Sequence, residues 1–191
     1  SIIFLKIKLK IINVWIATSD SGLLKYNLTT EAFSHYQFSA KNTASLTSNS
    51  VIKIYQDSEE SIWIATDNGL SIYDKSTDDF DRYTHSVNNP YSLNSDYIIT
   101  FFEDSNNIMW IGTFSGVNRW DPNMATFSQY SLQTNPEVQN FNITSFAQFD
   151  EKHLIFSAYS GGIYQLSLID NSISSASFSD FFADFRVMNL L

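Results

Sequence analysis

Residues 62–70 read Ile-Trp-Ile-Ala-Thr-Asp-Asn-Gly-Leu, and the chain contains this motif more than once. Residues 14–18 read Val-Trp-Ile-Ala-Thr, and residues 109–113 read Met-Trp-Ile-Gly-Thr. The tryptophans of the three copies, Trp15, Trp63 and Trp110, are therefore 48 and 47 residues apart. Self-similarity at a fixed period of this length is typical of a repeat protein, in which each repeat forms one small structural unit.

Glycine and aromatic residues follow the same period outside the motif. The glycines recur at intervals of 47, 47 and 46 residues, and phenylalanine and tyrosine each recur twice at intervals of 47. The positions are Gly22, Gly69, Gly116 and Gly162; Phe33, Phe80 and Phe127; and Tyr36, Tyr83 and Tyr130. The repeat therefore extends well beyond the tryptophan motif.

One unit, residues 50–86, divides into four short apolar runs separated by polar turns. The predicted strands cover residues 51–55, 61–66, 70–73 and 80–85, and a polar link with Pro90 follows. Gly69 supplies the positive φ that a tight hairpin turn requires. Four short antiparallel strands in a repeat of about 40 to 50 residues are typical of a β-propeller blade.

The period predicts an all-β chain of about four four-stranded antiparallel blades, which is a partial propeller or a fragment of one. We expect one repeat domain over residues 1–191, with blades near residues 2–41, 50–86, 97–131 and 141–180. The first strand should lie near Ile3, 12 residues before Trp15 as Val51 is 12 residues before Trp63, and the alternation of Lys6, Lys8 and Lys10 with apolar residues fits a strand there. The fourth copy is degraded, as terminal repeats often are, and Phe156 is placed where tryptophan is expected.

Composition excludes several classes of protein. The chain has 191 residues, a formal net charge of −9 and no cysteine. An acidic chain repels nucleic acid, and the absence of cysteine excludes disulfides and thiolate metal sites. The apolar run at residues 1–12 is shorter than the roughly 20 residues that a transmembrane helix needs, and it lacks a signal-peptide cleavage site. We therefore expect no membrane insertion by this segment.

Residues 45–80 and 92–130 share a longer ordered string of residues. It comprises Ser45-Leu46-Thr47 or Ser92-Leu93-Asn94, Asp57 or Asp104, the tryptophan motif, Gly69-Leu70 or Gly116-Val117, Tyr73-Asp74 or Trp120-Asp121, and Phe80 or Phe127. This string resembles the two-component regulator propeller repeat, well over residues 13–131 and loosely over 141–170. The family usually has about seven blades, whereas this chain has about four.

The resemblance implies a sensor region outside the cytoplasm of a bacterial signalling protein, such as a hybrid histidine kinase or a diguanylate-cyclase protein. It therefore implies a periplasmic location and a small-molecule or saccharide ligand that the sequence does not name. A kinase or cyclase output domain would lie outside this chain. The missing blades would come from further sequence or from a homodimer.

Recurrent polar residues have structural interpretations. Asp57 and Asp104 recur 47 residues apart, which indicates turn chemistry, and Asp74 and Asp121 end the third strand in the same manner. The acidic residues Asp78, Asp79 and Asp81 lack calcium-loop spacing and are interpreted as a solvated turn.

The histidines His35, His85 and His153 occupy unrelated repeat positions, so we expect structural roles for them. The repeated tryptophans are expected to pack in the core. No catalytic residue, metal site or cofactor is predicted.

A candidate ligand site follows from the propeller topology. The turn after each tryptophan strand and the link before each first strand should emerge on one face, where such scaffolds carry function. Amide and carboxylate groups can bond hydroxyls, and aromatic faces can cover C–H surfaces, which suits a polyol or sugar. The candidate residues are Asp20, Asp67, Asn68, Asn89, Tyr91, Asp96, Phe114, Ser115, Tyr159 and Ser160.

The sequence thus favours a non-enzymatic sensor or ligand-binding propeller segment. One alternative is a protein–protein interaction scaffold whose open blade edges complete a propeller with another chain. A propeller lyase or hydrolase is a second alternative, and it would need a convergent set of histidine and acidic side chains on the loop face.

Overall fold

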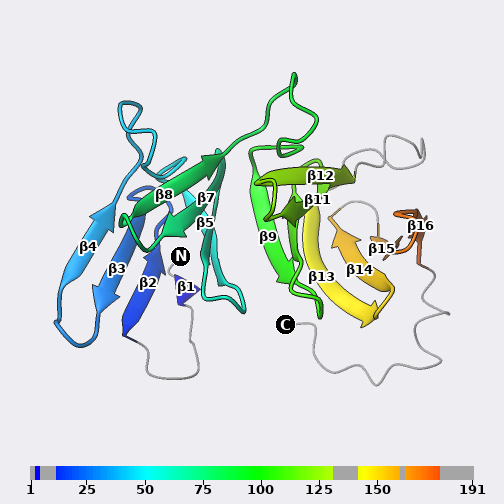
Figure 1. Cartoon of the computed structure of the whole chain (residues 1–191), viewed down its shortest axis with the longest axis horizontal. Coiled ribbons are helices and arrows are strands. Elements are labelled where there is room, and N and C mark those ends of the chain that lie inside the picture. Colours follow the sequence, from blue (N-terminus) through cyan, green and yellow to red (C-terminus); the bar gives the residue numbers. More distant parts are fainter. Residues whose placement is uncertain (1–2, 5–11, 131–141, 160–161, 177–191) are drawn as a thin grey trace.

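The computed structural model describes residues 3–4, 12–130, 142–159 and 162–176. These residues form four four-stranded antiparallel sheets, arranged as successive blades along the chain (Figure 1). Every regular secondary-structure element in the described residues is a β-strand. The predicted all-β fold of four four-stranded blades is therefore confirmed.

Each blade contains strands that are consecutive in the sequence and adjacent in the sheet. Blade 1 consists of β1 (Ile3–Phe4), β2 (Asn13–Ala17), β3 (Leu23–Asn27) and β4 (Phe33–Tyr36); blade 2 of β5 (Val51–Gln56), β6 (Ile62–Thr66), β7 (Gly69–Asp74) and β8 (Asp79–Tyr83). Blade 3 consists of β9 (Ile98–Glu103), β10 (Met109–Thr113), β11 (Gly116–Asp121) and β12 (Thr126–Tyr130); blade 4 of β13 (Ile143–Asp150), β14 (His153–Ala158), β15 (Gly162–Ser167) and β16 (Ile173–Ser175).

Two of the sequence predictions on chain organisation extend past the described residues. The first strand does lie at Ile3–Phe4, paired with β2, but Lys6, Lys8 and Lys10 lie outside the described residues. The single domain over residues 1–191 and its blade limits stay a prediction for the same reason.

The core is divided into three apolar clusters, and each cluster fills the seam between two consecutive blades. We call the face of a blade that points to the preceding blade its leading face, and the opposite face its trailing face. Trp15, Trp63 and Trp110 lie on trailing faces, and each is buried in the seam with the next blade. The predicted core role of the repeated tryptophans is confirmed.

The prediction for Phe156 is wrong. Ala158 pairs with Gly162 as Thr113 pairs with Gly116, so Ile155 has the place of Trp110 in its blade. Phe156 instead lies on the leading face, in the same cluster as Trp110 of the preceding blade. The turn of blade 4 has one residue more than the turn of blade 3, and a shift of one residue in a strand exchanges its two faces.

In blades 2 and 3 the recurrent aspartates hold the turn before the tryptophan strand, as predicted. Asp104 accepts the backbone N–H groups of Asn106 and Ile108 at 2.9 and 3.0 Å, and Asp57 accepts those of Glu59 and Ser61. Asp74 and Asp121 likewise accept backbone N–H groups two residues further on. These bonds satisfy turn donors that the strands leave unpaired.

Candidate functional site

The turns after the tryptophan strands and the links between blades lie at one end of the blades, which we call the link face. It comprises the turns at residues 18–22, 66–69, 113–116 and 158–159 and the links at 37–50 and 84–97, which project on the same side in Figure 1. Backbone hydrogen bonds join turn to link, from Gly22 N–H to the Asn49 carbonyl at 2.8 Å and from Gly69 N–H to the Asp96 carbonyl at 2.6 Å.

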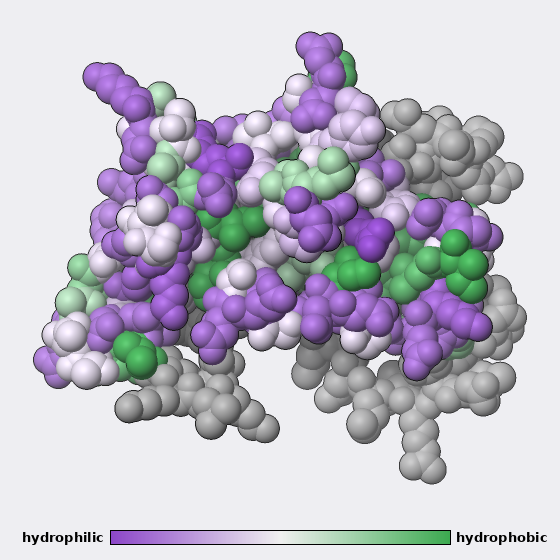
Figure 2. All heavy atoms as spheres, in the orientation of Figure 1, coloured by the Kyte–Doolittle hydropathy of each residue, from purple (hydrophilic) through white to green (hydrophobic). Residues whose placement is uncertain are grey.

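Both links have the same anchoring. Leu46 and Leu93 are fully buried, and the side chains of Asn49 and Asp96 accept the backbone N–H groups of Phe38 and His85. The tips of both links are mainly hydrophilic in Figure 2. Each link is therefore held at its base by an apolar anchor and by a side-chain cap, while its tip faces solvent.

Beneath the link face, a polar triad that is buried except for the half-buried Asn94 fastens each link to its blade. In blade 2 the hydroxyl of Thr47 bonds those of Thr66 and Ser71 at 2.9 and 3.1 Å. In blade 3, Asn94 Oδ1 accepts hydrogen bonds from Thr113 Oγ1 at 2.6 Å and from Asn118 Nδ2 at 2.8 Å. The two triads occupy the same repeat positions, but blade 2 uses three hydroxyls and blade 3 uses two amides and one hydroxyl. The three side chains within each triad are therefore chemically matched to one another. The sequence pattern does not predict these triads, although Ser-Leu-Thr and Ser-Leu-Asn contain their first members, Thr47 and Asn94.

The structure brings one group of candidate residues together. Asp67 and Asn68 are exposed on the turn of blade 2, and the next residue, Gly69, donates its N–H to Asp96. Tyr97 follows Asp96, and its ring meets the ring of Phe114 edge-on with centroids 5.8 Å apart. Tyr97 and Phe114 are 45% and 51% exposed, so an aromatic surface lies on the chain segment that the Gly69–Asp96 bond joins to the turn with Asp67 and Asn68.

Tyr97 was not among the predicted site residues. Its signal in the sequence is weak, because it begins a strand and was assigned to the sheet. Exposure of a large aromatic ring beside a second exposed ring is visible only once the fold is known. We call Asp67, Asn68, Asp96, Tyr97, Phe114 and Ser115 the inner group.

Other predicted site residues lie apart from the inner group. Asn89 and Tyr91 are on the outer part of their link, because the Tyr91 carbonyl accepts the N–H of Phe127 in the outermost strand of blade 3. Asp20 accepts the neighbouring Ser21 hydroxyl at 2.8 Å, and the exposed Tyr159 donates its N–H to Asn142. Ser160 lies outside the described residues.

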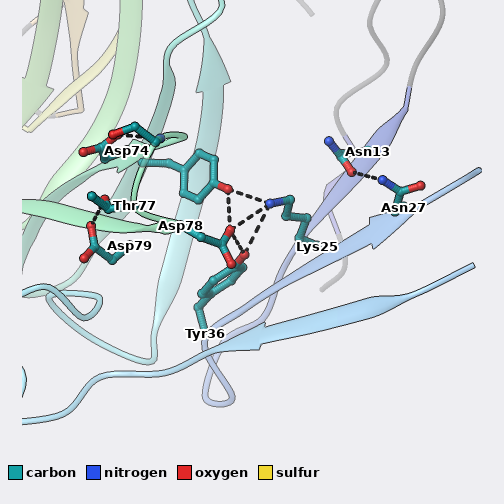
Figure 3. Close-up of polar contacts among 10 residues, drawn as sticks. Asn13, Lys25, Asn27, Tyr36, Asp74, Thr77, Asp78 and Asp79 are labelled. Atoms are coloured by element: carbon teal, nitrogen blue, oxygen red, sulfur yellow. Dashed lines mark hydrogen bonds and ion pairs between the residues drawn. The ribbon is translucent and has the colours of Figure 1, made fainter. Parts of the chain in front are cut away.

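A second polar cluster lies between blades 1 and 2, away from the link face. Lys25 Nζ donates to Asp78 Oδ1 at 2.9 Å and to the Tyr73 hydroxyl, and the Tyr36 hydroxyl donates to the same Asp78 oxygen at 2.7 Å. Figure 3 shows Lys25, Tyr36 and Asp78 pointing toward one another from different strands and turns. The ammonium also lies over the Tyr73 ring, 4.8 Å from its centroid, which adds a cation–π contact.

The charges in this cluster are mutually stabilised. The hydrogen bond from Tyr73 lowers the pKa of Asp78 to about 2, with Lys25 contributing further. Burial and the bond to Asp78 raise the pKa of Tyr36 and of Tyr73 to about 12. Burial opposes the charge of Lys25 and is the largest single effect, but the bond to Asp78 and the electrostatic interactions with Tyr36 and Asp78 together outweigh it and raise the pKa of Lys25. All four groups thus keep their ordinary protonation states at neutral pH.

Asp78 lies in a solvated turn, as predicted, and it also joins blades 1 and 2. Its side chain is 57% exposed, and one of its oxygens accepts hydrogen bonds from Lys25 and Tyr36 across the seam and from Tyr73 of its own blade. The other seams lack this charged pair: Ala125 has the place of Asp78 in blade 3, and Asn171 has it in blade 4, where it accepts the Tyr130 hydroxyl at 3.2 Å. The cluster is therefore specific to the first seam.

The histidines have local acceptors, in agreement with their predicted structural roles. His35 and His85 contact the carbonyls of Ser21 and Leu93 at 2.6 and 2.7 Å, and His153 contacts Asp150 at 2.9 Å. Across residues 3–4, 12–130, 142–159 and 162–176, no three metal-ligating side chains of His, Cys, Asp or Glu gather as a metal site would require. The same residues include no helix long and apolar enough to span a membrane.

Two segments of the chain, residues 45–68 and 92–115, match the family described as the two component regulator propeller. Each segment contains the end of a link, the first strand, the tryptophan strand and the following turn. The predicted family is therefore confirmed on these repeats. No curated protein sequence is significantly similar to the chain.

Several solved structures have the same fold. The extracellular domain assigned to a hybrid two component system of B. thetaiotaomicron matches with a TM-score of 0.76 and 24% identity, over 92% of this chain and 24% of that one. A second such extracellular domain from the same organism has a TM-score of 0.69 and 22% identity, over 90% and 24% of the chains. A computationally designed protein, Ika8, has a TM-score of 0.56 and 13% identity, over 86% and 46%. The chain thus spans about a quarter of the length of the two natural relatives.

Proposed function

Because the chain carries two-component regulator propeller repeats, we propose that it is a non-enzymatic ligand-sensing segment of a bacterial signal-transduction protein, located outside the cytoplasm in the periplasm. The location is supported by the two B. thetaiotaomicron relatives, which are extracellular domains. The output domain, a kinase or a cyclase, would belong to the rest of such a protein.

The observation that carries the ligand-binding proposal is the pair of exposed rings, Tyr97 and Phe114, on the link face, where the backbone hydrogen bond from Gly69 to Asp96 joins their segment to the turn that carries Asp67 and Asn68. Binding sites commonly combine an aromatic surface with a few polar groups that fix orientation. Carboxylate and amide groups bond hydroxyls, and ring faces cover C–H surfaces. The chain has a formal net charge of −9, which disfavours the binding of anionic ligands. A neutral saccharide or polyol therefore fits the inner group.

Sensing is preferred over catalysis because the three histidines and the Lys25–Asp78 pair of the described residues have local structural partners. His35, His85 and His153 each contact an acceptor of their own neighbourhood, and the Lys25–Asp78 pair is committed to a seam. A general acid or base must reach the reacting group of a bound substrate. The inner group offers carboxylates and rings, which suit recognition.

The experiment is calorimetric titration of the chain with a panel of neutral disaccharides, including maltose and cellobiose. A sugar that binds should lose at least tenfold in affinity when Phe114→Ala or Asp67→Ala is introduced. Tyr91→Ala is the matched control, because Tyr91 is an exposed aromatic residue on the outer part of the link. Unchanged affinity in Phe114→Ala and Asp67→Ala, with both variants folded, would contradict the proposed site.

A further inference from the structure

One backbone hydrogen bond recurs on the link face of three blades. The residue that follows the tryptophan strand, or its counterpart in blade 4, donates its N–H to the carbonyl of the residue that precedes the first strand. The donor and acceptor pairs are Asp67 and Ser50 at 3.4 Å, Phe114 and Tyr97 at 3.0 Å, and Tyr159 and Asn142 at 3.0 Å. The adjoining strand residues are paired in the same register in all three blades. Tyr159 is therefore the counterpart of Phe114, and Asn142 is the counterpart of Tyr97, one blade further on.

The turn position of this bond is aromatic and exposed on two successive blades. Phe114 is half exposed and Tyr159 is 83% exposed, whereas blade 2 has Asp67 at the same position. An exposed ring offers a flat apolar surface, and tyrosine adds a hydroxyl that donates and accepts hydrogen bonds. The aromatic surface of the inner group thus has an equivalent on blade 4.

Blades 3 and 4 pack closely beneath these two rings. Gly112 is two residues before Phe114, and Ile143 directly follows Asn142. A Cβ added to Gly112 would lie 2.8 Å from Cγ2 of Ile143, so the glycine permits the first strand of blade 4 to approach this closely. Asn142 is therefore held where blade 4 meets blade 3, and its carbonyl also accepts the N–H of Tyr159.

Asn142 has an unused hydrogen-bond acceptor at this junction. Its Oδ1 is buried and has no hydrogen-bond partner among the residues that the structure describes. Buried polar atoms are nearly always paired, so an unpaired one needs an explanation such as a water, an ion or a ligand. The terminal torsion of asparagine is broad, so a rotation of the amide directs the oxygen to an incoming donor. The hydroxyl groups of a saccharide are donors of this kind.

Resting on the proposed saccharide site, we infer that blade 4 carries a second binding position, formed by the ring of Tyr159 and the amide of Asn142. Packed sheets lie about 10 Å apart, which is longer than the spacing between neighbouring units of a saccharide chain. Phe114 and Tyr159 therefore contact units that are not adjacent, and the ligand is longer than a disaccharide. At the second position the ring covers a C–H surface, and the Oδ1 of Asn142 accepts a hydroxyl.

The test compares ligands of two lengths by calorimetric titration. Maltotetraose or cellotetraose should bind the wild-type chain about tenfold more tightly than maltose or cellobiose, which is the gain from one further aromatic contact. Tyr159→Ala should remove this gain and leave the affinity for the disaccharide unchanged, whereas Phe114→Ala should weaken the binding of both lengths. Tyr91→Ala, which removes an exposed ring on the outer part of a link, should change neither affinity.

Asn142→Leu separates a role in binding from a role in the fold. Leucine is similar in size and lacks the amide, so the substitution removes an acceptor that already has no partner. The melting temperature should not fall, whereas the affinity for the tetrasaccharide should fall about fivefold because one hydrogen bond is lost. The affinity for the disaccharide should stay at the wild-type value.

The outcomes distinguish this inference from the proposed function. Equal affinity for the two lengths, or an unchanged affinity for the tetrasaccharide in Tyr159→Ala or in Asn142→Leu, would overturn the second binding position. The proposed function would stand in these cases if Phe114→Ala still weakened the binding of the disaccharide. If no saccharide of either length binds, the proposed function fails, and the second position fails with it.

Discussion

The indole Nε1 of Trp110 lies 2.9 Å from Oδ2 of Asp104, so the tryptophan of the blade donates a hydrogen bond to the aspartate of the preceding turn. Trp63 and Asp57 repeat this bond at 2.8 Å. The other oxygen of each carboxylate accepts two backbone N–H groups of the turn. One side chain therefore couples the turn geometry to the position of the ring in the seam.

Asp104→Ala should reduce the free energy of unfolding by about 2 to 4 kcal/mol, because it leaves a buried indole N–H and two turn donors without acceptors. Urea unfolding followed by tryptophan fluorescence measures the change. Asp67→Ala is the control, since Asp67 is an exposed turn residue and its loss should cost less than about 0.5 kcal/mol. Equal effects of the two substitutions would show that the Trp110–Asp104 bond adds nothing.

The Lys25–Asp78 cluster predicts a pH dependence. The pKa of Asp78 is lowered to about 2 from 3.8, so its contribution to stability is complete above pH 3.8 and is lost as pH falls toward 2. The melting temperature of wild type minus that of Asp78→Asn should therefore be positive at pH 5 and shrink between pH 3.8 and 2. A difference that stays constant over this interval would contradict the role of the charged form. Asp81→Asn, in the same acidic segment, is the control.

The buried triads predict coupling between residues of one set. Thr47→Asn alone, or Ser71→Asn alone, should destabilise blade 2 by about 1 to 3 kcal/mol, because each places an unmatched amide among hydroxyls. The double substitution recreates the Asn94–Thr113–Asn118 set of blade 3 and should cost less than the sum of the single changes by about 1 kcal/mol. A double-mutant cycle from urea unfolding gives this coupling. Strict additivity would show that the triads are not matched sets.

The hairpin glycines predict unequal costs for one chemical change. Gly69 has a φ of +116°, and an added Cβ would lie 2.7 Å from the Tyr83 carbonyl oxygen. Gly162 also has a positive φ, of +92°, but an added Cβ there would have no atom of the described residues within 4 Å. Gly162→Ala should lower the free energy of unfolding by about 1 kcal/mol because of backbone strain. Gly69→Ala should lower it clearly more, because the backbone at Tyr83 must also move away from the added Cβ. Thermal unfolding of both variants distinguishes these outcomes.

The sequence was sufficient for those features that the repeat period controls. The buried tryptophans, the hairpin glycines and the turn aspartates each recur at one position, so periodicity alone located them. It failed at Phe156, because one additional turn residue shifted the strand and exchanged its faces. The inter-blade partners were also out of reach: Lys25 and Asp78 are 53 residues apart and occupy different repeat positions. Only the packing of blades brings them together.

The candidate site was predictable in part. Topology correctly associates turns with links, which is how Asp67, Asn68 and Phe114 were selected. It does not separate the inner part of a link from its outer part, so Asn89 and Tyr91 were grouped with residues that lie elsewhere on the link face. The ring contact of Tyr97 with Phe114 depends on side-chain direction at a strand end, which no sequence pattern encodes.

Residue-resolved titration of the ¹⁵N-labelled chain with the neutral disaccharide panel examines the sensor proposal at the level of single amides. Ligand binding at the inner group predicts shifts at the amides of Gly69, Tyr97 and Phe114, with those of Phe33 and Asn171 unchanged. If no sugar of the panel shifts these three amides, or if a binding sugar shifts only amides elsewhere, the link face of blades 2 and 3 is not the saccharide site.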